Sequence, residues 1–209
     1  MRTQSRTQRI SKLALLSVLL ALPIFTGSPF CSSEDKETEP PPPPSRSTID
    51  ALLTNWFERA YNNQDSILYE EMLADTFQFE FLEVDAQELR DRGILGPGEN
   101  FWGKTLDLGS TSRMFRSDNV TSITLDLVID STSPYTGIDC NNCTDVLATV
   151  TLRVGTITPT DPERILAVDS KQNFIVKPDP ADPTQWVIYR QIDSDLPAKQ
   201  ASDVASALP

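Results

Sequence analysis

The sequence predicts an α+β domain in which helices come first along the chain and an antiparallel sheet, wrapped on these helices, comes second. Apolar residues recur with helical spacing between residues 48 and 74. Four long segments between residues 120 and 192 then alternate apolar and polar side chains, as half-buried strands do. Short polar or proline-rich turns separate several of these segments, which favours an antiparallel meander.

The first helix is predicted to begin at Ser47 or Thr48, because either hydroxyl can cap it. Asp65 is placed to cap a second, shorter helix over residues 66–74. The apolar residues of the first helix recur every three or four positions and form a broad stripe that must face a core: Ile49, Leu52, Leu53, Trp56, Phe57 and Ala60.

Shorter elements are predicted in the middle of the domain. Thr76–Phe81 alternates strictly and predicts a strand. Asp85 and Glu88 form a capping-box-like pair for a small helix that ends at Gly93. Phe101 and Trp102 lead into a weaker helical stretch that runs through Met114 and Phe115 and is interrupted by Gly109. The four long strands follow at Val120–Ile129, Asp145–Ile157, Ile165–Val176 and Gln185–Ile192.

The N-terminal residues predict where the protein is delivered. Four cations precede an apolar run, Leu13–Phe25, which has the length of a secretion signal and is short for a membrane span. Residues 1–30 are therefore predicted as a signal peptide, with an uncleaved anchor as the alternative. Residues 31–46 are acidic and then proline-rich, which suits an extended tether. The globular domain is expected over residues 47–195, and the tail, 196–209, is expected to be disordered.

The segment around Cys31 resembles the lipobox of bacterial lipoproteins, in which a diacylglyceryl-modified cysteine becomes the mature N-terminus. The segment departs from that motif at Phe30, where a small residue is usual. Cleavage without lipidation is the rival interpretation. The resemblance implies a membrane anchor at Cys31 and a location in the cell envelope, either the periplasm or the outer surface.

The cysteine count is odd, which needs an explanation in an exported protein. A disulfide between Cys140 and Cys143 leaves Cys31 as the unpaired thiol, which lipidation would account for. Thiol redox catalysis is the alternative for this C-N-N-C pair. The flanking Asp139 and Asp145 disfavour the thiolate that such chemistry needs. A zinc site would need two further ligands, so no metal and no cofactor is predicted.

Charge and composition exclude several functions. The chain has 18 Lys and Arg residues against 30 Asp and Glu residues, a net charge of −12. Removal of the signal with its four cations lowers the net charge from −12 to −16. Such a surface repels phosphate backbones, so nucleic acid is not an expected partner. The chain contains no histidine, which excludes a hydrolase triad of the usual kind.

The order of the predicted elements resembles the NTF2-like superfamily of α+β cones, which includes SnoaL-type polyketide cyclases and ketosteroid isomerases. Three passages carry the resemblance: the helix through Trp56–Tyr61, the passage Tyr69–Phe77 and the closing strand Trp186–Asp193. The resemblance covers residues 47–195. It implies a strongly curved antiparallel sheet with an apolar pocket between the sheet and the helices.

Candidate pocket residues are Trp56, Phe79, Phe101, Trp102 and Met114. The alternative is that these side chains fill the cone as ordinary core. Asp126 and Arg153 belong to neighbouring strands and alternate with the apolar positions. If they point inward, they form a polar site with a perturbed carboxylate. If they point outward, they form an exposed cross-strand pair worth under about 1 kcal/mol.

Two hypotheses of function remain from the sequence. The first is a non-catalytic, membrane-tethered domain that binds a small apolar ligand or a protein partner. The second is an isomerase- or cyclase-like enzyme that uses carboxylate and tyrosine groups in the cone. A homodimer through the open face of the sheet is a further expectation.

Overall fold

The computed structural model describes residues 45–158 and 161–194, so the predicted signal, Cys31 and the predicted disordered tail lie outside the described residues. Its elements, in chain order, are η1 (Ala51–Phe57), α2 (Glu58–Asn62), α3 (Ser66–Glu71), β1 (Leu73–Glu80), α4 (Glu83–Asp91), β2 (Phe101–Gly103), α5 (Lys104–Phe115), β3 (Val120–Pro134), β4 (Thr144–Thr158), β5 (Asp161–Pro178) and β6 (Trp186–Ser194). The predicted α+β class is confirmed. The first helix is π-helical over η1 and continues directly into α2.

The six strands form one sheet in the order β2-β1-β6-β5-β4-β3. Strands β3 to β6 make the antiparallel meander that the sequence predicts. The pairing of β1 with β6 is parallel, whereas β1 with β2 is antiparallel. Alternation along a strand shows which residues share a face, but it does not show which strand lies alongside or in which direction. The parallel pair was therefore not predicted.

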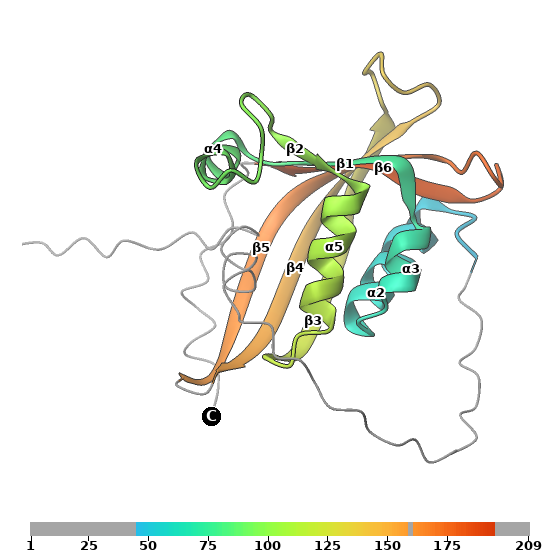
Figure 1. Ribbon diagram of the computed structural model, residues 1–209. Helices are drawn as coiled ribbons and strands as arrows, with labels where there is room; N and C mark the ends of the chain where they lie inside the picture. The colour runs from blue at the N-terminus through green and yellow to red at the C-terminus, as the bar shows by residue number, and fades with distance from the viewer. Residues whose placement is uncertain (1–44, 159–160, 195–209) are drawn as a thin grey trace, which may run out of the picture.

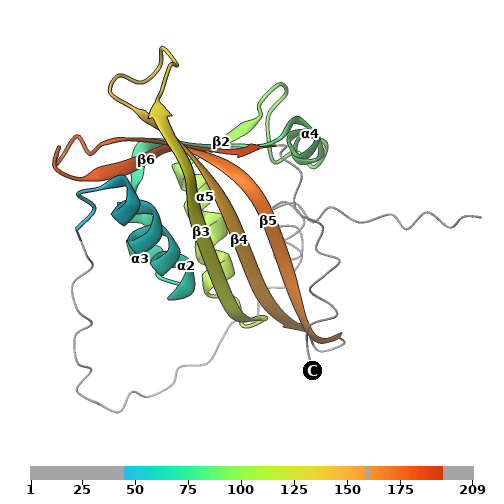
Figure 2. The ribbon, with the colours of Figure 1, turned by 180° about the vertical axis from the view of Figure 1, so that it is seen from behind.

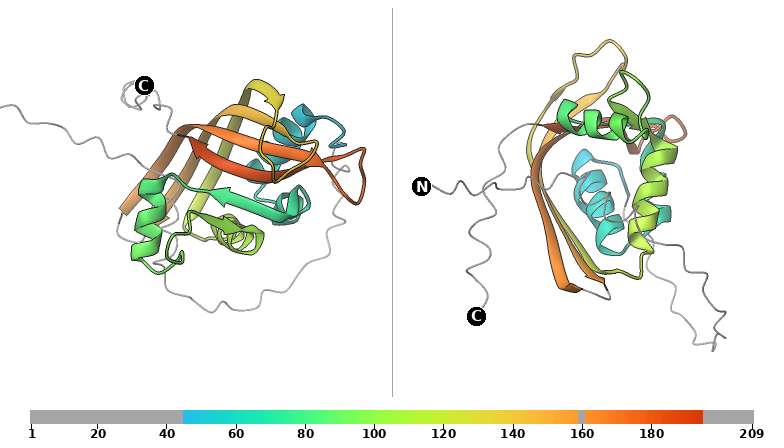
Figure 3. Two further views of the ribbon diagram at one scale, coloured as in Figure 1. Left: turned by 90° about the horizontal axis from the view of Figure 1, so that it is seen from above. Right: turned by 60° about the vertical axis from the view of Figure 1, so that its left-hand side comes forward.

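The sheet curves strongly around the helices (Figure 1). Strands β3, β4 and β5 run along one side of the molecule, with α5, α2 and α3 on the inner side of the sheet in both opposite views (Figures 1 and 2). Figure 3, right, shows α2 and α5 inside the curve of the sheet. Helix α4 lies apart from them, beyond β2 at one end of the sheet (Figure 1).

The core lies between the inner face of the sheet and the helices. The apolar parity of β3 and β4 is buried on this face, as the strand alternation predicts. The buried strand residues include Ile123, Leu125, Leu127, Ala148, Val150, Leu152 and Val154. The helical stripe of η1 packs against them through Leu52, Leu53, Trp56 and Phe57. Alternation and helical spacing thus identify the two surfaces that meet in the core.

The helix starts follow their predicted caps. Thr48 Oγ1 accepts a hydrogen bond from the Ala51 amide at 3.0 Å. Asp65 Oδ1 accepts from the amides of Ile67 and Leu68 at 3.0 and 2.9 Å, which satisfies two amides that the first turn of α3 leaves free.

Strands β3 and β5 extend beyond their predicted ranges, and two helix boundaries also differ from the prediction. The second helix ends at Glu71 and not at residue 74, because Leu73 already pairs with Ile188 in the parallel ladder. The small helix α4 begins at Glu83, so Asp85 lies in its first turn and not at its cap. At the end of α3, long-range strand pairing decides a boundary that local propensity leaves open.

Candidate functional site

A phenol and a carboxyl group pair deep inside the cone. Tyr69 on α3 is 0% exposed and Asp107 on α5 is 1% exposed, and Tyr69 Oη donates to Asp107 Oδ2 at 2.6 Å. Burial raises the pKa of Tyr69 well above its usual value, and the neighbouring Asp107 and Tyr61 raise it further. Tyr69 therefore keeps its proton and acts as a hydrogen-bond donor at neutral pH.

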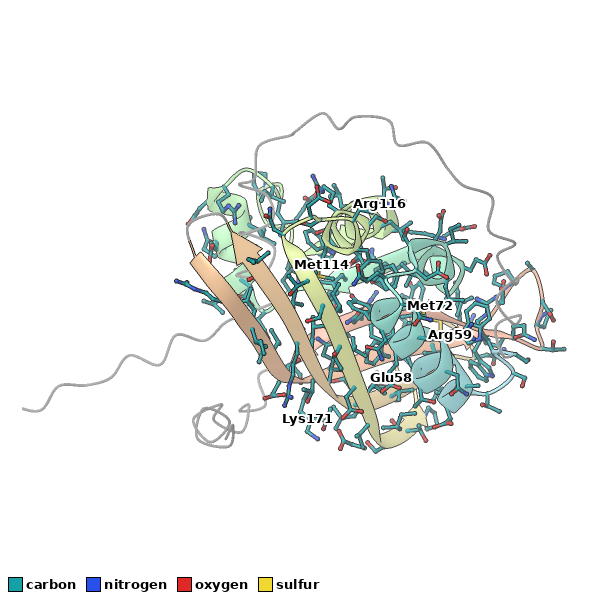
Figure 4. The ribbon with its side chains drawn as sticks, turned by 90° about the horizontal axis from the view of Figure 1, so that it is seen from below. Glu58, Arg59, Met72, Met114, Arg116 and Lys171 are labelled. Atoms are coloured by element: carbon teal, nitrogen blue, oxygen red, sulfur yellow. A yellow bond between two sulfur atoms is a disulfide. The ribbon has the colours of Figure 1, made fainter. Side chains whose placement is uncertain are left out.

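Asp107 reaches the interior because of its place on α5. Asp107, Ser110, Thr111 and Met114 follow i, i+3, i+4, i+7 spacing and are all buried. These positions share one face of a helix. Figure 4 shows Met114 on the helix side of the sheet. The face of α5 turned toward the interior is therefore largely polar.

A second buried polar group comes from the sheet. Gln191 on β6 is 1% exposed, and its Nε2 donates to Gln172 Oε1 at 2.6 Å. Gln172 in turn donates to Asp193 Oδ1 at 3.0 Å. Gln191 pairs with Phe79 of β1 on one side and with Phe174 of β5 on the other, and both rings are fully buried. The Gln191 side chain therefore faces the interior of the cone.

We call three buried polar atoms, which come from α5, β6 and β2, the polar seam: Asp107 Oδ1, Gln191 Oε1 and Trp102 Nε1. Trp102 is 4% exposed and pairs across the ladder with Phe79, the residue that also pairs with Gln191. Among the residues that the structure describes, none forms a hydrogen bond with any of these three atoms. Buried polar atoms in proteins nearly always have a partner, either a protein group or an ordered water, so the polar seam offers hydrogen-bonding positions to water or to a polar group of a ligand.

Aromatic rings surround the polar seam on both sides. On the β1–β2 side, Phe81 packs against Phe79 and Trp102 with ring centroids 4.8 and 4.7 Å apart. On the helix side, Tyr69 lies within a second group of rings, whose centroids are 5.1–6.3 Å apart: Phe57, Tyr61, Tyr69, Phe115 and Phe174. The geometry offers one donor and two acceptors in an otherwise aromatic environment.

Four of the five predicted apolar pocket residues are inside the cone: Trp56, Phe79, Trp102 and Met114. Phe101 is 37% exposed, because it alternates with Trp102 on the short strand β2. Asp126 and Arg153 are exposed and do not line the interior. They alternate with the buried Leu125 and Leu152, and the side chains of adjacent strand residues point to opposite faces.

The sequence did not identify Tyr69, Asp107 or Gln191 as site residues. Gly109 interrupts the helical pattern around Asp107. Gln191 lies in a strand whose pattern is dominated by apolar residues. The helical spacing of Asp107 with Thr111 and Met114 was the available signal for a polar residue on a buried face.

The predicted disulfide between Cys140 and Cys143 is present, in the loop between β3 and β4. Over residues 45–158 and 161–194, no group of three or more Asp, Glu or Cys residues is placed to hold a metal ion. No helix within the same residues has the length and apolar character that a membrane span requires.

Comparison with known proteins gives a shared fold at low sequence identity. No family model matches the sequence, and no curated protein matches it either. Among solved structures, the chain is similar to the Kfla4162 protein of Kribbella flavida, with 9% identity, a TM-score of 0.52, and coverage of 75% of this chain and 91% of that one.

Two further solved structures have lower TM-scores. An NTF2-like superfamily protein from Salmonella enterica serovar Typhimurium has 10% identity and a TM-score of 0.48, over 74% of this chain and 93% of that one. A ketosteroid isomerase-like protein from Erwinia carotovora atroseptica has 13% identity and a TM-score of 0.46, over 73% and 97%. At such identities the likeness concerns the fold alone. The chain has a mixed α+β fold, in which helices pack inside a strongly curved six-stranded sheet (Figure 3).

Proposed function

We propose that the chain is an exported, membrane-tethered domain that binds a small, largely apolar molecule inside its cone without transforming it. The polar seam carries this proposal. Its donor, Trp102 Nε1, and its acceptors on Asp107 and Gln191 need partners that the described residues do not supply. A flat molecule with one hydroxyl group can bond to a donor and an acceptor while its apolar surface contacts the aromatic rings.

Binding without turnover agrees with the state of the phenol–carboxyl pair. Tyr69 holds its proton, and the Asp107 carboxyl already accepts that hydroxyl at 2.6 Å. A general base must instead accept a proton from the substrate near neutral pH. Asp107 thus keeps one oxygen, Oδ1, to orient a ligand.

The contacts of the first described residues support a tether that joins the domain at a defined position. Arg46 lies at the end of the predicted tether, and the Trp186 amide donates to its carbonyl at 3.0 Å. The Arg46 amide donates to Gln185 Oε1 at 2.6 Å, and its guanidinium lies 4.7 Å above the Trp56 ring. The guanidinium also pairs with Asp179 at 3.4 Å. The chain therefore enters the domain at a fixed point.

Calorimetric titration with 2-naphthol tests the ligand site, because this probe has a flat apolar surface and one hydroxyl. Loss of one hydrogen bond costs about 1 kcal/mol, so Trp102→Phe and Asp107→Asn are each expected to weaken binding by roughly fivefold. Asp126→Asn, which changes an exposed carboxylate, is the matched control and should bind as the wild type does. Equal affinity in all four proteins, or no binding by the wild type, would contradict the proposal.

Mass spectrometry of the mature N-terminus tests the tether separately. A chain that starts at Cys31 and carries a diacylglyceryl group is the expected product. An unmodified chain that starts elsewhere would end the lipoprotein interpretation, while the ligand proposal would stand.

The Tyr69–Asp107 pair also favours one alternative, an isomerase-like enzyme in which the phenol donates to a substrate carbonyl. That function requires Tyr69 to leave Asp107 when substrate binds. A 2-naphthol complex in which the Tyr69 hydroxyl has exchanged Asp107 for the ligand, seen in a crystal structure, would favour the enzyme.

A further inference from the structure

The loop between β3 and β4, residues 135–143, is anchored to a strand that is not its neighbour. Asp139 in this loop accepts hydrogen bonds from Tyr189 Oη at 3.1 Å and from Arg190 Nη2 at 2.6 Å, both on β6. Tyr135 Oη donates to the same carboxylate at 3.0 Å. In the sheet, β4 and β5 lie between β3 and β6. The loop, which we call the flap, therefore reaches past β4 and β5 to β6. It is the gold loop that projects from the end of β3 and β4 in Figure 1.

A bulge in β6 builds the receiving site for Asp139. Ile175 of β5 pairs with Arg190, and the next residue, Val176, pairs with Ile188, so Tyr189 is an extra residue on β6. A bulge of this kind can bring two successive side chains to the same side of a sheet. Tyr189 and Arg190 consequently form a fork that holds one oxygen of Asp139.

The flap end of the sheet has apolar residues on the outer face. Phe174 and Val176 belong to the main core, and Ile175 between them is 1% exposed without belonging to that core. Val187, next to the core residue Ile188, is 3% exposed and lies outside the core in the same way. Alternation places Ile175 and Val187 on the outer face, where the anchored flap is the segment that crosses toward β6.

The disulfide closes the turn directly after Asp139. Cys140 is partly exposed and Cys143 is 6% exposed, and the Tyr135 amide donates to the Cys143 carbonyl at 3.0 Å. The cross-link thus limits the backbone freedom of residues 140–143, which directly follow Asp139. Removal of a cross-link returns conformational entropy to the closed segment.

We propose that the Cys140–Cys143 disulfide is a redox latch: in its oxidised form it keeps Asp139 in the Tyr189–Arg190 fork, and its reduction by a dithiol opens the flap and uncovers Ile175 and Val187. A thiolate of the dithiol attacks the partly exposed Cys140 Sγ, the disulfide bond breaks, and Cys143 leaves as a thiolate that takes up a proton. The second thiol of the reductant then displaces Cys140 as a free thiol. The protein gains two electrons and two protons, and the dithiol becomes a disulfide.

Hydrogen exchange of the full chain tests the latch. The chain carries Cys31→Ser, so that Cys140 and Cys143 are its only cysteines. Dithiothreitol is expected to speed exchange of the flap amides by at least about tenfold, while the amides of β3 to β5 keep their protection. Fluorescence of 1-anilinonaphthalene-8-sulfonate should rise as the apolar patch is uncovered. The double variant Cys140→Ser/Cys143→Ser should behave as the reduced chain without any reductant.

Asp139→Asn is the matched variant, because it keeps the disulfide and weakens the anchor. Its flap should exchange fast in the oxidised form, and dithiothreitol should add little. Equal flap exchange in the oxidised, reduced and double-serine chains would overturn the proposal. So would a loss of protection that spreads equally over the whole sheet, since the flap would then not open on its own.

Discussion

The side-chain amide of Asn62 makes both hydrogen bonds of a strand partner with the backbone of Leu125. The Leu125 amide donates to Asn62 Oδ1 at 2.7 Å, and Asn62 Nδ2 donates to the Leu125 carbonyl at 3.1 Å. Two residues on, the Leu127 amide donates to Glu58 Oε1. Figure 4 shows Glu58 on the helix that flanks β3. Helix α2 thereby covers part of the free edge of β3, which would otherwise be open to pairing with another chain.

Substitution of Asn62 by alanine is expected to lower the free energy of unfolding by about 1–2 kcal/mol, because two hydrogen bonds at the sheet edge are lost. Urea denaturation measures this change. Asn63→Ala, at the adjacent exposed position, is the control and should cost less than about 0.5 kcal/mol. A loss no larger for Asn62 than for Asn63 would show that the edge contacts contribute nothing measurable.

Tyr69→Phe should destabilise the fold by about 1–3 kcal/mol, because it leaves a buried Asp107 oxygen without its donor. Asp107→Asn, which keeps an oxygen acceptor for the Tyr69 hydroxyl, should cost less. Thermal or urea unfolding of the two variants provides the comparison. The opposite order would mean that the 2.6 Å hydrogen bond contributes less than the carboxyl group itself.

The raised pKa of Tyr69 also determines the direction in which the stability of the fold changes with pH. The unfolded chain ionises this tyrosine near pH 10, whereas the folded chain does so only at higher pH. Unfolding therefore becomes easier as pH rises above 10, and Tyr69→Phe removes this part of the dependence. Absorbance at 295 nm during alkaline titration reports the ionisation directly. Titration of all four tyrosines in the native protein near their usual pKa would contradict the burial of Tyr69.

Acid is expected to open the flap. The hydrogen bond from Tyr135, together with the charge of Arg190 and the hydrogen bond from Tyr189, lowers the pKa of Asp139 below its usual value of 3.8. The stabilisation is present above pH 3.8 and is lost as the pH falls through the lower folded-state value. Amide chemical shifts of the flap should follow this titration, and Asp139→Asn should abolish it. A flap that titrates alike in both proteins would exclude Asp139 as the cause.

Arg46→Ala should lower the free energy of unfolding by about 1–2 kcal/mol, since it removes a cation–π contact with Trp56 and a partly buried ion pair with Asp179. It should also speed proteolysis at residues 45–48. Arg113→Ala, an exposed cation on α5, is the control for the loss of one positive charge. Equal effects of the two substitutions would mean that the junction is not clamped.

The sequence predicts much of this fold because local signals and packing agree there. The Asp65 cap and the alternation of β3 and β4 each follow from a residue's immediate neighbours. The parallel partner of β1 depends on contacts between distant parts of the chain, and no short window of sequence contains them. The seven π-helical residues of η1 likewise have no sequence signature beyond ordinary helical spacing.

The candidate site was harder to predict for a related reason. Whether Asp107 is buried depends on which face α5 turns to the sheet, and a helix with a largely polar inner face gives a weak amphipathic signal. The outward direction of the Asp126 and Arg153 side chains was easier to predict, because alternation with buried leucines decides between the two faces of a strand.

The parallel pairing of β1 with β6 has a consequence for the time course of folding. Gln78 pairs with Arg190, and these residues are 112 positions apart along the chain. Closing so long a loop carries a large entropic cost before any contact offsets it, which slows folding. Strands β1 and β2 cannot join the meander until β6 has been synthesised, so in a growing chain the β1–β2 pair stays apart from the meander until β6, the last described strand, emerges.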